Sequence, residues 1–240
     1  RLAMLERGYL EILTPVAGAD TAMARHLKDS MGRYVGVHLI AFAVADAEAE
    51  AERLARAGFR LQPTVNLRRT IEAADGSQAQ VAFTVVRAQF GSIPEGRLQV
   101  LTHLTPEHLW QERYIARDNA ITGLCAAVLA VPDPEASAER LARFTGRGAR
   151  QAEGGGTISL DRGRLTFSTP EAIARRYGGL RSPPAPAMAA LGLVSRDLDR
   201  TRGFLLGRGV GLLVDQPERL IVDPQDAMGA ALVIEPEKSG

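Results

Sequence analysis

The chain has 240 residues, 45% of them hydrophobic, which is enough to bury a sizeable core in one large domain or two of about 120 residues. Its formal net charge is +1, with 29 basic and 28 acidic side chains mixed along the sequence, so we expect neither nucleic acid nor a membrane surface as a partner. No apolar stretch approaches the roughly 20 residues of a membrane span. The single cysteine, Cys125, cannot form an internal disulfide, so we expect a cytoplasmic protein and read this thiol as buried and inert.

The first segment, RLAMLERGYLEILTP at residues 1–15, reads as two strands around Gly8. Glu11 stands between two aliphatic residues, where a lone carboxylate costs several kcal/mol unless it is paired, protonated or bound to a metal. The segment matches TISLDRGRLTFSTP at residues 157–170 piece for piece. Because the chain opens in strand-like sequence, we expect a further strand and helix upstream of Arg1.

A longer pattern begins three times along the chain. Each copy has an apolar run long enough for one strand, then an aspartate that can cap a helix, then a helical stretch that ends near a glycine. The first two copies share the hexamer AERLAR, and the third is weaker. The copies begin at Gly36, Gly123 and Ala187, and their capping residues are Asp46, Asp133 and Asp197.

Strand-like pieces separated by turn residues follow each predicted helix, as at Asp75 and Gly76 in the first copy. The repeating unit is therefore βαβββ, and a repeat of this size defines the architecture. We predict an α+β protein of tandem βαβββ modules paired into cupped mixed sheets, with the first module incomplete at its N-terminus. The pairs would be residues 1–122 and 123–240.

This arrangement resembles the vicinal oxygen chelate superfamily, and GVHLIAF with HLTPEHLW looks most like its glyoxalase-like branch. The resemblance implies metal ligands on the first and fourth strands of paired modules. Those slots hold His38, Glu11 and Gln99, and the fourth, where a histidine is implied, would lie upstream. Imidazole, carboxylate and amide oxygen together suit a divalent ion such as Zn, Fe, Mn or Ni.

The same slots in the second pair of modules carry no credible ligand set, so we read that pair as a degenerate scaffold. They hold Cys125, Thr166, Ala189 and Leu232. Each first-pair residue also has a plainer interpretation. His38 alone is more often a hydrogen-bonded core histidine, Glu11 alone can pair with an arginine, and Gln99 alone is a polar strand residue that lines a cavity.

Three further residues are candidates for the site. His103 shares a strand face with Gln99 and could serve as a general base or a replacement ligand, or lie at a solvated rim. Thr105 before Pro106 predicts a helix that carries Trp110 to the edge of the cup, as linker packing or as a substrate contact. Arg68 could bind a substrate carboxylate, although a solvated arginine is the default.

The leading function from sequence is a glyoxalase-like, metal-dependent enzyme with Glu11 and His103 in catalytic roles. Its small oxygenated substrate would chelate the ion, and isomerase, lyase and extradiol-dioxygenase chemistry all stay open. The alternative is a metal-free small-molecule binding protein of the bleomycin-resistance type. A third hypothesis is a catalytically dead paralogue. A small molecule is the expected partner, and homodimerisation is left open.

Overall fold

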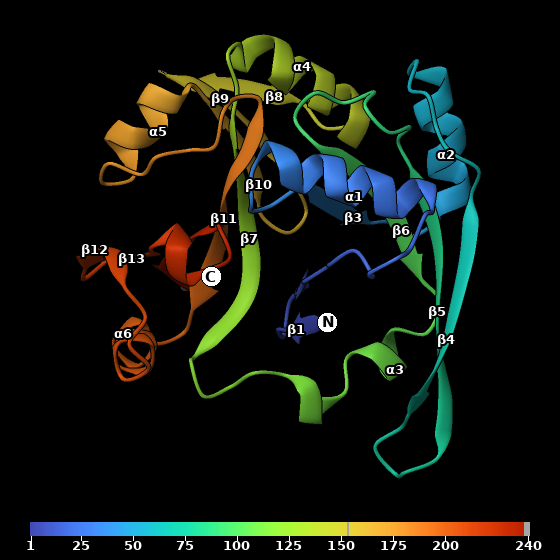
Figure 1. The fold of residues 1–240 in the computed structure, drawn as a ribbon, viewed down its shortest axis with the longest axis horizontal. Coiled ribbons are helices and arrows are strands. Elements are labelled where there is room, and N and C mark those ends of the chain that lie inside the picture. Colours follow the sequence, from blue (N-terminus) through green and yellow to red (C-terminus); the bar gives the residue numbers. More distant parts are fainter. Residues whose placement is uncertain (153, 238–240) are drawn as a thin grey trace.

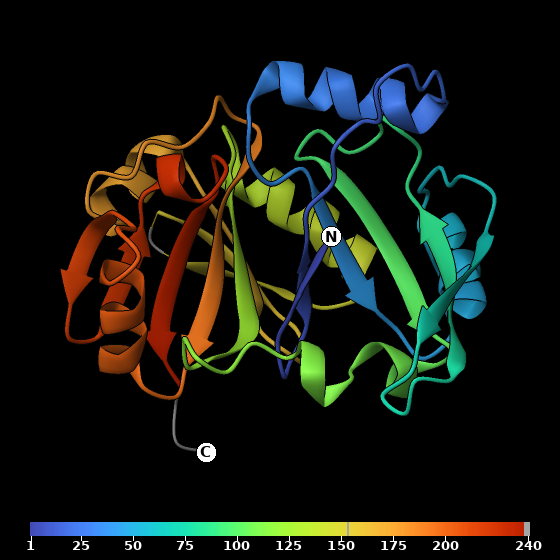
Figure 2. The same cartoon turned by 60° about the horizontal axis from the view of Figure 1, so that its bottom comes forward.

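The computed structural model describes residues 1–152 and 154–237, and their strands form three sheets. A two-stranded and a four-stranded sheet come from the N-terminal half of the chain, and an eight-stranded sheet comes from the C-terminal half. Figures 1 and 2 show the two larger sheets side by side, with α4 near the seam between them and α2 on the outer side of the four-stranded sheet.

The N-terminal half contains one βαβββ module preceded by a short hairpin and a helix. Its elements in chain order are β1 (Leu2–Met4), β2 (Tyr9–Glu11), α1 (Ala22–Arg33), β3 (Leu39–Ala43), α2 (Ala47–Arg56), β4 (Val65–Glu72), β5 (Gln78–Arg87), β6 (Arg97–His103), α3 (Pro106–Leu109) and a 3-10 turn at Glu112–Tyr114.

The four-stranded sheet has the order β3-β6-β5-β4, in which β3 and β6 are parallel and the other pairs are antiparallel. The register places Ala41 opposite Gln99, and Gln99 opposite Arg87. Paired residues lie on the same face of a sheet and neighbours along a strand lie on opposite faces. This register therefore decides which side chains can meet.

The C-terminal half contains two complete modules. Its elements are β7 (Ile121–Ala130), α4 (Pro134–Thr145), β8 (Ala149–Ala152), β9 (Gly155–Ser159), β10 (Arg164–Ser168), α5 (Pro170–Arg176), β11 (Ala187–Ser195), α6 (Leu198–Leu206), β12 (Leu212–Gln216), β13 (Arg219–Val222), a 3-10 turn at Pro224–Asp226 and β14 (Ala231–Pro236).

The eight-stranded sheet joins these two modules through their first strands, β7 and β11, which pair antiparallel at its centre. Each first strand also pairs in parallel with the last strand of its own module, β10 or β14. The predicted α+β fold of tandem βαβββ modules is confirmed. The division at residue 122 stays a prediction, because the sheets separate there while the core does not.

The predicted helix caps are present in all three modules. The side chains of Asp46, Asp133 and Asp197 each accept hydrogen bonds from backbone N–H groups in the first turn of the helix that follows. These bonds satisfy donors that have no partner within the helix. The strand-to-helix junction is therefore a local property that the sequence encodes three times.

The match between residues 1–15 and 157–170 is also a match of conformation. Gly8 has φ +94° and Gly163 has φ +93°. Leu5 donates its N–H to the carbonyl of Gly8, and Leu160 does the same to Gly163. The hairpin β1–β2 thus has the same turn as β9–β10, as expected for the end of a module.

One large apolar core links the two halves. It contains Leu54 of α2, Leu98 of β6, Leu129 of β7 and both Leu141 and Phe144 of α4, all nearly inaccessible to solvent. The face of the four-stranded sheet that bears Leu98 packs into this core. Its opposite face, which we call the inner face, is turned toward the β1–β2 hairpin and α1.

The helix α1 had no counterpart among the sequence predictions. Thr21 caps it by accepting a hydrogen bond from the N–H of Ala24, and Ala24 and Ser30 are its buried residues. Figure 2 shows α1 lying along one edge of the N-terminal half, near the end of the four-stranded sheet. This helix places Met23 and His26 beside the inner face.

Candidate functional site

The inner face of the four-stranded sheet carries a polar end and an aromatic end. Arg97, Gln99 and His103 alternate along β6 and therefore share this face, and Arg87 joins them as the register partner of Gln99. The polar end consists of Arg87, Arg97 and Gln99. The aromatic end is centred on His103.

Arg87 and Arg97 are half-buried and have no acidic partner within ion-pair distance among the described residues. The Nε atom of each guanidinium is buried and has no hydrogen-bond partner there. Arg97 donates to the Oε1 of Gln99 at 3.3 Å and lies 2.9 Å from the sulfur of Met23. A buried, unpaired polar group is unfavourable, so this pair of cations calls for an explanation.

Arg87 and Arg97 are two neighbouring cations, and the pKa of Arg97 reflects this. Burial is the main cause that lowers the pKa of Arg97 to about 10, the charge of Arg87 lowers it further, and Glu11 acts in the opposite direction. Burial also lowers the pKa of Arg87. Both groups still carry their charge at neutral pH, so the polar end is a positively charged, partly desolvated surface.

The aromatic end is a cluster of rings between the sheet and the hairpin. His103 meets Tyr9, Phe83 and Trp110 edge to face, with ring centroids 6.1, 5.4 and 5.0 Å away. The hydroxyl of Tyr9 lies 3.5 Å from the Nε2 of His103, and the indole N–H of Trp110 donates to the carbonyl of Leu5. The hairpin is thereby anchored over this end of the inner face.

Burial favours the neutral form of the His103 imidazole. It lowers the pKa of His103 below its ordinary value. A neutral imidazole can accept a proton or a hydrogen bond. The predicted placement of His103 on the face of Gln99 agrees with the register, whereas its proposed catalytic role stays a prediction.

Glu11 ends the short strand β2 and is exposed, with Leu2 as its register partner. It acts electrostatically on both Tyr9 and Arg97, so it lies near the inner face. The unfavourable burial that made this carboxylate stand out in the sequence does not occur, because the strand is at the surface. Exposed apolar side chains accompany it on the N-terminal segment, including Leu2, Ile12 and Leu13.

His38 lies just before β3 and has its own partners. Its Nε2 lies 2.9 Å from the carbonyl oxygen of Tyr34, and the two rings stack at 4.1 Å. Among the described residues, no hydrogen bond joins His38 to Glu11 or Gln99. The expectation that His38 faces Glu11 across a cup stays a prediction.

His38 also lines a small cavity of about 60 Å³ under α1, together with His26 and Arg97. Burial lowers the pKa of His38, and burial with the nearby charge of Arg97 lowers the pKa of His26. His26 also stacks on Phe90 at 4.1 Å. These contacts match the plainer interpretation of His38 as a hydrogen-bonded core histidine.

The predicted ligand set of Glu11, His38 and Gln99 is poorly suited to a divalent ion as it stands. The Nε2 of His38 is engaged with the carbonyl of Tyr34, and the amide oxygen of Gln99 already accepts from Arg97. Two guanidinium groups beside Gln99 would repel a cation. Among the residues that the structure describes, no three His, Cys, Asp or Glu side chains are grouped so that they could hold a metal.

The two residues predicted to contact substrate, Arg68 and Trp110, occupy different positions relative to the inner face. Arg68 is exposed on β4 and pairs with Ala82, which puts it on the face away from Arg87. The predicted helix after Thr105 is present as α3, and it delivers Trp110 to the aromatic end. Trp110 therefore borders the inner face, whereas Arg68 does not.

The corresponding region of the C-terminal half is filled by its own chain. Ile173, Tyr177 and Leu180, from α5 and the loop after it, pack against Val128 and Ala189 of the eight-stranded sheet. Thr166 and Ala189 are buried. The thiol of Cys125 is half-buried, and burial raises its pKa, as expected for an inert cysteine. The interpretation of the second pair of modules as a degenerate scaffold stays a prediction, and these contacts favour it.

Sequence reasoning missed Arg87 and Arg97, because arginine is abundant in this chain and its bias was read as compositional. The available signal was periodicity. Arg97, Gln99 and His103 have the spacing of one strand face in a strand that otherwise alternates with Leu98 and Val100. A strand with one buried apolar face and one face of this polar kind predicts that the polar side chains line a binding surface.

The comparisons with known proteins bear on the fold and family. A family model described as a glyoxalase-like domain matches residues 1–145, which is more than half of the chain. The chain belongs to the glyoxalase-like domain family. The resemblance to the vicinal oxygen chelate superfamily is thereby confirmed. No curated protein matches this glyoxalase-like chain.

Solved structures resemble the chain at low sequence identity, and the first of them shows the fold. A hypothetical protein from Staphylococcus aureus has a TM-score of 0.60 and 8% identity, over 90% of this chain and 72% of that one. Methylmalonyl-CoA epimerase from Mycobacterium tuberculosis has a TM-score of 0.40 and 18% identity, over 54% and 97%. The Streptomyces coelicolor epimerase in complex with 2-nitronate-propionyl-CoA has 0.38 and 14%, over 48% and 97%. Within the described residues, no helix is long and apolar enough to cross a membrane.

Proposed function

We propose that this glyoxalase-like protein binds a small organic anion on the inner face of its N-terminal sheet, without a metal. The anionic group would contact Arg87 and Arg97, and the body of the molecule would lie toward His103, Tyr9 and Trp110. This is the binding-protein alternative that the sequence left open, with the charge of the ligand now specified.

The observation that carries the proposal is the pair of buried, partnerless Nε atoms on Arg87 and Arg97. A guanidinium presents its donors in a planar fork that matches a carboxylate or a phosphate. The positive charges of two neighbouring guanidinium groups would be neutralised by one doubly charged group or by a dicarboxylate. Gln99 holds Arg97 in place through its Oε1, which leaves the Nε–H of Arg97 available to a ligand.

The aromatic end supports a ligand with an apolar part. Tyr9 and His103 are polar rings in an otherwise apolar setting, and Trp110 is half-buried beside them. Binding surfaces of this kind commonly combine apolar walls with a few placed polar groups. A molecule with an anionic group at one end and a ring or short chain at the other fits this distribution.

Thermal unfolding in the presence of a panel of mono- and dicarboxylates and phosphate esters tests the proposal. A ligand at ten times its Kd stabilises the folded state by about 1.4 kcal/mol. We expect at least one anion to raise the Tm of the unmodified protein and to lose that effect in Arg97→Gln and in Arg87→Gln. Arg68→Gln, an exposed arginine on the opposite face, should respond like the unmodified protein.

Two results would count against this function. One is a panel in which no anion raises the Tm. The other is an equal response from Arg68→Gln and Arg97→Gln, which would show that the anions act on the general charge of the surface.

The metal-dependent enzyme expected from the sequence is the second candidate, and neutral His103 is the observation that favours it. A neutral imidazole on the same strand face as Gln99 is in the protonation state that a general base requires. Metal analysis of protein purified without chelator, before and after incubation with Zn, Fe, Mn or Ni salts, separates the candidates. A stoichiometric ion lost in Gln99→Leu would favour the enzyme over the metal-free binding protein.

A further inference from the structure

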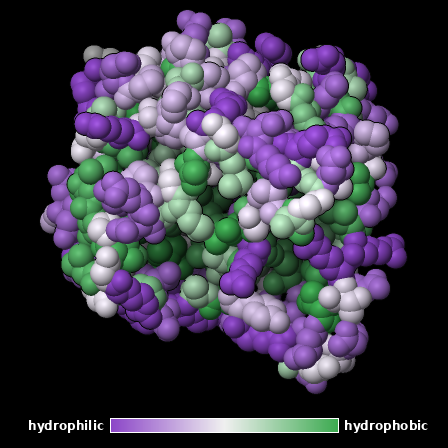
Figure 3. Space-filling view, viewed as in Figure 1, coloured by the Kyte–Doolittle hydropathy of each residue, from purple (hydrophilic) through white to green (hydrophobic). Residues whose placement is uncertain are grey.

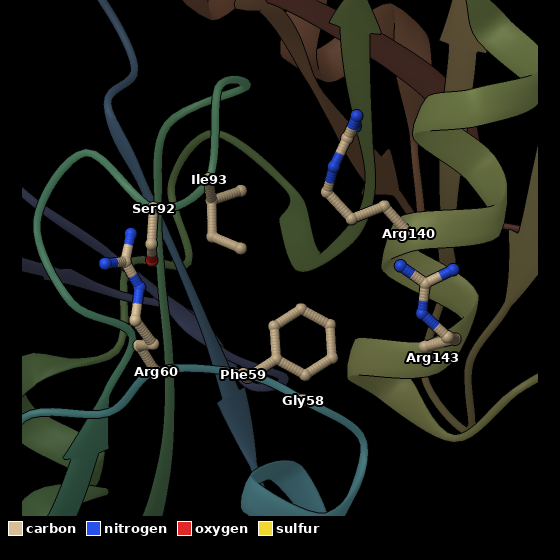
Figure 4. Close-up of a pocket in the computed structure, with 7 residues that line it drawn as sticks. All are labelled: Gly58, Phe59, Arg60, Ser92, Ile93, Arg140 and Arg143. Carbon is tan, nitrogen blue, oxygen red and sulfur yellow. The ribbon is translucent and has the colours of Figure 1, made fainter.

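A second cavity lies at the seam between the two halves. It has a volume of about 200 Å³ and is lined by Gly58, Phe59, Arg60, Ser92, Ile93, Arg140 and Arg143. Figure 4 shows Arg60 and Ser92 on one wall, Arg140 and Arg143 on the helix α4 opposite, and Phe59 and Ile93 between them. We propose that this cavity binds a small anion with an apolar body, such as an aromatic carboxylate or phosphate ester.

The walls of the cavity are held together by contacts that do not consume its charges. Arg53 of α2 donates to the backbone carbonyls of Arg143 and Phe144, which joins the two helices beside the cavity. The ring of Phe59 meets Phe144 edge to face at 5.1 Å. The floor is therefore continuous with the shared apolar core, and the two walls keep their spacing without a ligand.

The charge around the cavity is unbalanced. Arg140 donates to the Oε1 of Glu95 at 3.0 Å, and Glu95 is almost completely buried behind it, so this pair is neutral overall. Arg60 and Arg143 have no ion-pair partner among the residues that the structure describes. Within the part of the chain that the structure describes, no acidic residue lines the cavity. Two positive charges therefore remain to attract an anion, in addition to the pair of cations on the inner face.

The lining also indicates the body of the ligand. Ile93 is buried and Phe59 is half-buried, and both belong to or pack against the shared core. Burying an apolar group against them contributes about 25 cal/mol per Å² removed from water. The hydroxyl of Ser92 already donates to the carbonyl of Gln89, which leaves its oxygen only as an acceptor. Arginines are then the donors for the anionic group.

Amide NMR of the full chain, titrated with benzoate, phenyl phosphate, acetate and inorganic phosphate, tests this site. We expect saturable shifts at Phe59, Ser92 and Ile93 with the two aromatic anions, and binding at least about tenfold weaker with acetate and inorganic phosphate. Arg60→Gln with Arg143→Gln should weaken benzoate binding by at least about tenfold, because two charge-assisted contacts are lost. Both side chains are exposed, so the double variant should fold.

Two control variants make the result specific. Arg56→Gln removes an exposed arginine at the end of α2 that does not line the cavity, and it should bind as the unmodified protein does. Arg87→Gln disables the inner face and should leave the shifts at Phe59 and Ser92 unchanged. Absent shifts at these amides, equal weakening by Arg56→Gln, or full binding by the double variant would each overturn the proposal.

Discussion

Arg97 holds a positive charge in a half-buried position that its neighbours only partly offset. Its charge survives at neutral pH, its Nε lacks a partner among the described residues, and a second arginine lies beside it. Replacing buried charged groups by well-packed apolar ones is often neutral or stabilising. The proposed anion would give these two charges a partner that the described residues do not supply.

Replacing Arg87 by methionine should not destabilise the protein. The side chain of Arg87 makes no hydrogen bond among the described residues, so we expect Arg87→Met to raise the free energy of unfolding by about 1 kcal/mol or leave it unchanged. Arg53→Met, which removes bonds to two carbonyls and Glu50, should lower it by about 2 kcal/mol. Urea unfolding measures both, and a loss of stability in Arg87→Met as large as that in Arg53→Met would contradict this account.

His103 should make stability depend on pH. Its pKa is lowered in the folded state, so below an unfolded pKa of about 6.5 the unfolded chain binds more protons and stability falls with falling pH. We expect the loss of unfolding free energy between pH 7.5 and 5.5 to be smaller in His103→Phe than in the unmodified protein. An unchanged loss in His103→Phe would be evidence against a buried neutral imidazole.

The elements of the fold were largely predictable because their signals are local. Aspartate caps at Asp46, Asp133 and Asp197 and the glycine turns act within a few residues, so the repeated βαβββ unit can be read from the sequence. The face that a strand residue occupies is different, because a one-residue change of register inverts it. Gln99 and His103 were placed correctly on one face because both lie within β6, whereas His38 precedes β3 and its placement opposite Glu11 stays a prediction. Arginines with no partner could be recognised only once the tertiary contacts were known.

The two matched turn glycines should tolerate a methyl group unequally. Gly8 and Gly163 share a positive φ, which costs an alanine about 1–2 kcal/mol in the left-handed region. A Cβ at Gly163 would lie 2.2 Å from the carbonyl oxygen of Cys125, whereas at Gly8 it would lie 3.5 Å from the Cβ of Leu124. We expect Gly163→Ala to lower the Tm clearly more than Gly8→Ala. Equal losses would mean that the two turns are not packed as described.

At the scale of the whole molecule, the halves share one core while presenting different surfaces. Arg53 of α2 donates to backbone carbonyls of α4, and Phe144 contacts both Phe42 and Phe59 of the other half. In the C-terminal half, Ile173 and Tyr177 cover the corresponding face of the eight-stranded sheet. The inner face of the N-terminal half is lined by polar and aromatic side chains instead. Figure 3 shows the surface in the view of Figure 1, with apolar side chains near its centre among hydrophilic ones.

The shared core predicts that the halves unfold together. Phe144→Ala removes a ring that is 1% exposed and should cost about 3–5 kcal/mol. Trp110 is the single tryptophan and lies in the N-terminal half, so its fluorescence reports on the half that does not contain Phe144. We expect its unfolding midpoint to fall in step with far-UV circular dichroism. The midpoint should move little in Phe204→Ala, whose ring packs under Arg208 at the periphery. A fluorescence transition unmoved by Phe144→Ala would show that the halves are independent.

The central claim is that Arg87 and Arg97 keep donors free for an anion, and their side-chain Nε–H resonances test it directly. The two signals are assigned by their loss in Arg87→Lys and Arg97→Lys, and the protein is titrated with succinate and with phenyl phosphate. The account predicts saturable shifts of both signals with at least one of these anions, and no saturable shift for the exposed Arg68. Signals from Arg87 and Arg97 that stay fixed, or that move only as Arg68 does, would contradict it.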